Sequence, residues 1–218
     1  MNERTQDRLF ALCGIGSVVV ELVGALIAMG HGQIHSLTWT SSTSSIAQAF
    51  AKPATTVVWV GAYLEALSMG LFLAFAVWAC ARLGGGILGA IARGAAVANV
   101  AVTMVSLGLM DAEAYLAGHG LGISAARTLV TANGATYVTT WFLSAFFLLG
   151  VGPLALAAGR RIVGWSAVGL AALILVATAA SPSNLGQLAS TASLLWIAGT
   201  SIALLRREPK HAAIPVTV

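Results

Sequence analysis

The feature that most constrains this chain is the spacing of its charged residues, because six long stretches almost free of charge separate short basic clusters. With 58% hydrophobic residues and a mean hydropathy of +0.90, the 218-residue chain has too few polar groups to cover a soluble domain. About 20 apolar residues span a hydrocarbon core of about 30 Å as a helix. We therefore predict an all-α fold, a polytopic six-transmembrane-helix bundle that forms a single transmembrane domain over residues 1–218. The predicted spans are residues 9–29, 57–80, 87–110, 134–157, 162–179 and 185–205.

The basic residues predict which side of the membrane each loop occupies, because basic residues in short loops stay in the cytoplasm during insertion. With six spans both termini share one side, and that side carries eight basic residues: Arg4, Arg8, Arg82, Arg160, Arg161, Arg206, Arg207 and Lys210. The opposite side carries only Lys52 and Arg127, and Arg93 falls inside the third span. We therefore predict a plasma (inner) membrane protein with both termini in the cytoplasm.

The net charge of +4 and the pI of about 9.6 follow from this asymmetry. A basic cytoplasmic surface favours contact with anionic lipids of the inner leaflet. No basic stripe alternates with aromatic residues, so the sequence does not favour a nucleic-acid partner.

Two longer loops, residues 31–56 and 111–133, are expected on the outer side. Ser44 or Ser45 is a candidate cap for a short helix over residues 46–51, which Lys52 and Pro53 would end. A second, interfacial helix is expected around residues 124–131.

Small residues recur every four positions on two spans and predict close helix contacts. The alternative is a general richness in alanine. The two stripes are Ala62, Ala66, Gly70 and Ala74 on the second span, and Gly86, Ala90 and Gly94 on the third.

Two carboxylic acids, Glu21 and Glu65, lie well inside apolar spans. Each is about eight residues from the outer end of its span, so both are expected roughly 12 Å below the outer surface. Because an ionised acid in hydrocarbon is costly, such groups face the bundle interior and usually have a partner. The pair is therefore predicted to share a proton, bind a cation or line a polar cavity; the alternative is two separately protonated structural acids.

Arg93 and Asn99 are the polar groups of the third span. Arg93 either snorkels to the inner interface or points inward to pair with a carboxylate. Its depth argues against Glu21 or Glu65 as a direct partner. Asn99 lies nearer mid-span and is predicted to hold two helices together by a hydrogen bond.

The outer rim collects residues that are weak candidates for a metal site. They are His31, His35, Asp111, Glu113 and His119. No H-E-x-x-H or C-x-x-C spacing is present, nor a P-loop, a G-x-S-x-G elbow or a pair of histidines within the spans to hold haem. We therefore expect solvated rim residues, with no metal and no cofactor.

Three segments carry a resemblance to a known family. They are Y-L-E-A-L around Glu65, G-A-I-A-R ending at Arg93, and R-R-I-V-G-W from Arg160, followed by Gly169. Together they resemble a family of uncharacterised bacterial six-helix integral membrane proteins, which is defined as a domain of unknown function. The resemblance implies the fold and topology over nearly the whole chain, and no activity.

Three functions are compatible with the sequence. The first is a small carrier or proton-linked transporter that uses Glu65 and Glu21, with a small molecule or lipid as ligand. The second is a non-catalytic membrane subunit or stability factor that acts through a protein partner or as a homo-oligomer. The third is an intramembrane enzyme acting on lipid or quinone. The two acids favour the first and third, and the lack of any catalytic motif favours the second.

Overall fold

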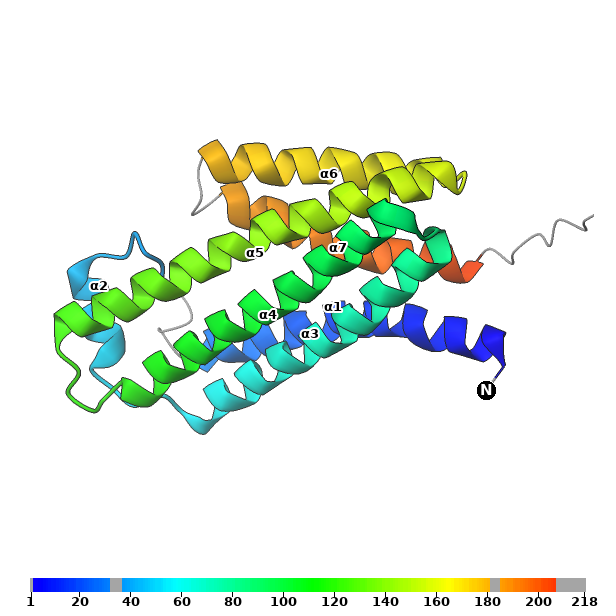
Figure 1. Cartoon of the computed structure of the whole chain (residues 1–218). Helices are drawn as coiled ribbons and strands as arrows, with labels where there is room; N and C mark the ends of the chain where they lie inside the picture. The colour runs from blue at the N-terminus through cyan, green and yellow to red at the C-terminus, as the bar shows by residue number, and fades with distance from the viewer. Residues whose placement is uncertain (1, 32–36, 181–184, 207–218) are drawn as a thin grey trace, which may run out of the picture.

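The computed structural model describes residues 2–31, 37–180 and 185–206, and in that part of the chain every regular element is a helix (Figure 1). The helices are α1 (Glu3–His31), α2 (Thr43–Phe50), α3 (Thr56–Leu83), α4 (Gly86–Leu116), α5 (Ile123–Ala157), α6 (Arg161–Ala180) and α7 (Leu185–Arg206). The all-α prediction is therefore confirmed for the described residues.

The six long helices form a bundle in which sequence neighbours run antiparallel, and α2 lies across one end (Figure 1). Helix α1 packs mainly on α3, α4 on α5 and α5 on α6, while α7 contacts both α6 and α1. Helix α1 begins and α7 ends at the same end of the bundle, which we call the N-terminal end; the opposite end is the α2 end (Figure 1). Antiparallel packing of neighbours follows from the short turns, such as Gly84–Gly85 between α3 and α4.

Aromatic side chains join the halves of the bundle. Phe147 on α5 makes edge-to-face contacts with Phe72 on α3 and with Trp196 on α7, with ring centroids 5.5 Å and 6.3 Å apart. All three side chains are buried in one apolar cluster, where edge-to-face geometry aligns the ring quadrupoles favourably. These contacts position α5 as the central helix.

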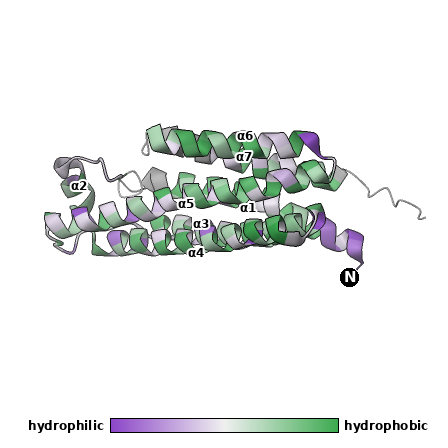
Figure 2. Ribbon diagram, turned by 45° about the horizontal axis from the view of Figure 1, so that its top comes forward, coloured by the Kyte–Doolittle hydropathy of each residue, from purple (hydrophilic) through white to green (hydrophobic). Residues whose placement is uncertain are grey.

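Five helices, α1, α3, α4, α5 and α6, are long and apolar enough to cross a membrane. In α7 the described apolar stretch, Thr191–Leu205, is shorter. Large apolar side chains such as Leu26, Val176 and Leu195 point outward, and Figure 2 shows hydrophobic residues along most of the long helices. Hydrophilic residues gather at the start of α1 (Figure 2). An apolar exterior of this kind suits lipid rather than water, so the chain is a membrane-embedded helical protein.

The helices at the α2 end differ from the sequence-based expectation. Helix α4 continues past position 110 to Leu116, and α5 begins at Ile123, so the predicted separate helix over 124–131 is the first part of α5. Hydroxyls of Thr128 and Thr131 donate to backbone carbonyls four residues earlier, which satisfies them inside the helix. Helix α2 is capped by Ser42, whose side chain accepts from the backbone N–H of Ser45, so the predicted caps Ser44 and Ser45 were wrong.

The predicted small-residue stripes are only partly used as contacts. On α3, Ala62 is buried, but a Cβ built on Gly70 would meet nothing within 4 Å. On α4, Gly86 is the first residue of the helix, at positive φ, and a Cβ built on Gly86 or Gly94 would meet nothing within 4 Å, so the prediction for this stripe was wrong. A repeat of small residues identifies a face that permits close approach, without deciding which helix approaches it.

Candidate functional site

The backbones of helices α1 and α3 approach each other closely where two glycines, Gly24 and Gly61, face each other. A Cβ built on Gly24 would lie 2.9 Å from the backbone oxygen of Gly61, and one on Gly61 would lie 2.8 Å from the Cβ of Ala28. Both distances are too short for real contacts, so only glycine fits at the two positions. The sequence analysis did not single out this crossing, because the two glycines belong to different helices.

The two intramembrane acids lie beside this glycine crossing. Glu21 precedes Gly24 by one turn of α1, and Glu65 follows Gly61 by one turn of α3. The Cγ atom of Glu65 would be 3.1 Å from a Cβ on Gly24, so the missing side chain leaves space that Glu65 crosses. The crossing therefore sets how closely the acid-bearing turns approach.

Ser68 contacts both acidic residues. Its hydroxyl oxygen lies within hydrogen-bond distance of Oε2 of Glu21 and 2.7 Å from the backbone carbonyl oxygen of Glu65, three residues earlier on α3. The carboxyls of Glu21 and Glu65 are within electrostatic range of each other. The sequence predicted that the two acids lie together; the structure adds Ser68, which the sequence analysis missed.

Two further helices contribute groups toward the acids. Asp111 on α4 lies within electrostatic range of Glu65, and Tyr137 on α5 lies within range of both Glu21 and Glu65. The ring of Tyr137 packs edge-to-face on buried Trp141, with centroids 5.6 Å apart. Asp111, expected as a solvated rim residue, instead belongs to the surroundings of the acid pair. We call Glu21, Glu65 and Ser68 the acid site.

The acid site has the groups needed to hold a proton or a small cation. Two carboxyls supply four oxygen atoms, and the Ser68 hydroxyl can both donate and accept. Because both residues are half-buried within apolar helices, two full negative charges side by side would be costly. A shared proton or a bound cation removes that cost.

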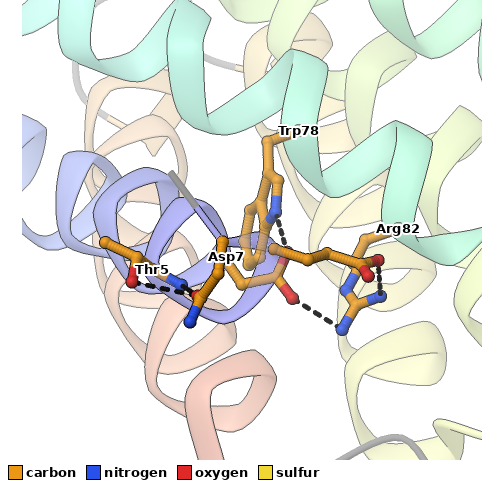
Figure 3. A network of polar contacts seen from close by, with 6 residues as sticks. Thr5, Asp7, Trp78 and Arg82 are labelled. Carbon is orange, nitrogen blue, oxygen red and sulfur yellow. Dashed lines mark hydrogen bonds and ion pairs between the residues drawn. The ribbon is translucent and has the colours of Figure 1, made fainter.

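A second polar network ties α1 to α3 at the N-terminal end of the bundle (Figure 3). The carboxylate of Asp7 accepts from the Trp78 indole N–H at 2.8 Å and pairs with the Arg82 guanidinium at 2.7 Å. Glu3 lies 4.0 Å from Arg82 and is far more exposed. The sequence analysis used Arg82 only as a topological charge. The pairing could have been found from Asp7, an acid one helical turn after the start of α1. It lies at the same depth as Arg82, the basic residue at the end of α3.

The predictions for Arg93 and Asn99 compare differently with the structure. Arg93 is half-buried near the start of α4 and lies within electrostatic range of Cys80 on α3. Among the ion pairs seen between described residues, none joins Arg93 to a carboxylate. Asn99 is buried and its side-chain amide donates to Ser144 on α5 at 2.7 Å, so its predicted role as an interhelical contact is confirmed.

The candidate metal residues whose side chains the structure describes, Asp111, Glu113 and His119, do not form a cluster that could hold a metal. Glu113 is fully buried against α5, beside Asn133, so the expectation of a solvated residue was wrong. His119 is exposed and stacks on Tyr115, with ring centroids 5.4 Å apart. His35 and the side chain of His31 lie outside the described residues. In the described part of the chain no three His, Cys, Asp or Glu residues gather so that they could hold a metal.

Comparison of the chain with protein-family models, curated proteins and solved structures found no match. The site geometry, set within a membrane-embedded helical bundle, is therefore what any functional inference rests on.

Proposed function

We propose that this protein is a small multi-pass carrier in which the acid site binds and releases a proton, coupled to movement of a small molecule or lipid. The observation that carries the proposal is that the carboxyls of Glu21 and Glu65 lie within electrostatic range of each other inside two apolar helices, with Ser68 beside Glu21. Acids inside membrane spans are costly to keep, and in membrane proteins they typically mark proton or ion pathways. If close packing were the only requirement, small apolar residues like those that surround the crossing would be sufficient, and no acid would be needed.

The geometry around Ser68 supports a bound proton. A serine hydroxyl has a single proton to donate, yet the oxygen of Ser68 is close to two acceptors. Both contacts are full hydrogen bonds at the same time only when Ser68 donates to the carbonyl of Glu65 and a protonated Glu21 donates to Ser68. Loss of that proton leaves Ser68 with one proton to donate to Glu21 or to the carbonyl of Glu65, so the hydrogen bonding of Ser68 depends on whether Glu21 carries a proton.

The proposal includes a six-span topology with both termini in the cytoplasm of the plasma membrane. Five spans are long and apolar, and the sixth would be α7, whose end lies beside the start of α1. The eight-to-two division of basic residues supports the orientation. A reporter fused after Lys210 should be active only inside the cell, and one inserted at Ser42 only outside. An external C-terminus would contradict an even number of crossings.

The same orientation places Arg82, Arg160 and Arg161 at the cytoplasmic ends of helices, where anionic lipid headgroups are the proposed partners. Membership of the six-helix family that the chain resembles remains a prediction.

The test of the carrier function is the variant Glu65→Gln in a native host that lacks the wild-type copy. Gln keeps the shape and hydrogen-bonding capacity of a protonated Glu but cannot release a proton, so we expect loss of the growth or transport phenotype with a normally folded protein. Glu3→Gln is the matched control, because Glu3 is an exposed acid at the N-terminal end. A fully active Glu65→Gln variant would refute proton coupling and leave the non-catalytic subunit as the better explanation.

A further inference from the structure

A second buried acid, Glu113, lies on α4 toward the α2 end of the bundle. Its side chain is 1% exposed, and in the described part of the structure its Oε1 atom has no hydrogen-bond partner. An ionised carboxylate in this position would keep an unpaired charge away from water, which is strongly destabilising. The position therefore calls for an additional bound species.

Asn133 on α5 is the hydrogen-bonding neighbour of Glu113. The Ser106 hydroxyl in turn donates to Oδ1 of Asn133 at 2.6 Å. With its oxygen bonded to Ser106, the Asn133 amide has its N–H groups left to donate to the carboxyl. One carboxyl oxygen is thus satisfied and Oε1 is the open position.

Helix α2 closes the end of the bundle above this acid. Ala117, one turn beyond Glu113 on the same face of α4, is fully buried with Ile46 and Phe50 of α2 in a small apolar cluster. The backbone N–H of Gly118 donates to the carbonyl of Phe50 at 2.8 Å, which fixes α2 to the end of α4. We call α2, with the turn that follows it, the cap.

The charged groups near the cap are few. Helix α2 carries no charged or titratable side chain, while Lys52 in the turn of the cap and His119 beyond the end of α4 are both exposed. On α5, Arg127 extends to the cap and donates to Thr43 Oγ1 at 3.0 Å and to the Ser41 carbonyl at 3.4 Å. On α4 itself, Asp111 lies within range of Glu65 in the acid site. No described basic side chain is seen paired with Glu113, so a proton is the simplest species that neutralises it.

We propose that Glu113 is a second proton-binding site and that its protonation holds the cap closed on α4 and α5. Release of the proton leaves a carboxylate that must reach water, and the cap is the smallest unit whose opening provides it. The site is separate from the acid site and does not depend on the carrier function.

The test is hydrogen–deuterium exchange of residues 43–50 in the purified full-length protein, comparing wild type with Glu113→Gln at each pH. Comparison at equal pH removes the intrinsic pH dependence of amide exchange. At acidic pH the two proteins should exchange alike. At alkaline pH the wild-type cap should exchange faster by about tenfold or more, since a buried unpaired charge costs several kcal/mol and 1.4 kcal/mol is a factor of ten. Glu3→Gln, at the other end of the bundle, should behave as wild type.

If the Glu113→Gln variant does not fold, the wild-type protein alone tests the proposal. Its amide exchange in the cap should rise with pH more steeply than its amide exchange in α6. Equal exchange of wild type and variant at alkaline pH, or cap and α6 rising in parallel, would overturn the proposal. Replacing sodium by choline should leave the result unchanged; a dependence on sodium would assign the site to a metal cation and overturn the assignment to a proton.

Discussion

The glycine crossing of α1 and α3 gives the sharpest prediction, because adding one methyl group at Gly24 should separate the acid-bearing turns. The new Cβ would lie 2.9 Å from the backbone oxygen of Gly61, 3.0 Å from the Cβ of Leu64 and 3.1 Å from the Cγ of Glu65. A backbone oxygen cannot rotate away, so the helices must move apart. Gly24→Ala is therefore expected to destabilise the bundle.

The change in the free energy of unfolding caused by Gly24→Ala follows from two opposing effects. Overpacking of a tight contact costs about 1–3 kcal/mol. Replacing glycine by alanine inside a helix returns up to about 1 kcal/mol. If the full gain is realised, the net loss for Gly24→Ala is therefore up to about 2 kcal/mol. Gly70→Ala on α3 is the matched control, since its Cβ meets nothing within 4 Å and only the helix-propensity gain of about 0.5–1 kcal/mol remains.

Unfolding by SDS in mixed micelles, followed by fluorescence of the six tryptophans, measures both variants. The two substitutions should shift the free energy of unfolding in opposite directions. A Gly24→Ala protein as stable as Gly70→Ala would refute the close approach of α1 and α3 at this crossing, and with it the spacing that brings the acids together.

Two further substitutions test the polar contacts of α1. Ser68→Ala removes the hydroxyl that bonds Glu21 and should lower the free energy of unfolding by about 1 kcal/mol in the same SDS assay; an unchanged stability would mean that the contact does not hold the helices together. Asp7→Ala removes the partner of Arg82 at the N-terminal end and should cost about 1 kcal/mol, whereas Glu3→Ala, at the more distant and exposed acid, should cost close to nothing. Equal losses for the two acids would contradict the assignment of Asp7 as the principal partner.

The parts of the fold that could be predicted from the sequence are those set by hydropathy. A span must be apolar over its whole length, so the positions of α1, α3, α4, α5 and α6 follow directly from the uncharged stretches. The pairing of Glu21 with Glu65 was also predictable, because matched depth on neighbouring helices leaves few other arrangements for two costly acids.

The α2 end was less predictable because local signals there are misleading. Asn133 followed by Gly134 resembles a helix break, yet α5 passes through both residues. A Cβ on Gly134 would lie 3.4 Å from the Cβ of Trp39, so a small residue at this position lets Trp39 pack closely on α5. The burial of Glu113 beside Asn133 of α5 likewise depends on a tertiary contact that no local sequence pattern signals.

Some polar contacts between α4 and α5 do have a sequence signal. Asn99, Thr103 and Ser106 on α4 are spaced by four and three residues, and their hydroxyls and amides bond each other or polar residues of α5. Such spacing places polar groups on one helix face. The spacing of Asn99, Thr103 and Ser106 therefore predicts the polar contact between α4 and α5 that Asn99 alone suggested.

The most direct test of the central claim is an infrared titration of the protein reconstituted in lipid bilayers, with Glu21→Gln and Glu65→Gln as difference partners. If the acid site holds an exchangeable proton, wild type should show a carboxylic-acid carbonyl band that disappears as the pH rises. Each variant should remove part of that band and change the pH at which the remainder disappears, because the two carboxyls lie within electrostatic range of each other. Glu3→Gln should leave the band unchanged. If neither acid-site variant alters a protonated carboxyl band at any pH, Glu21 and Glu65 do not share a proton, and the account of the site is wrong.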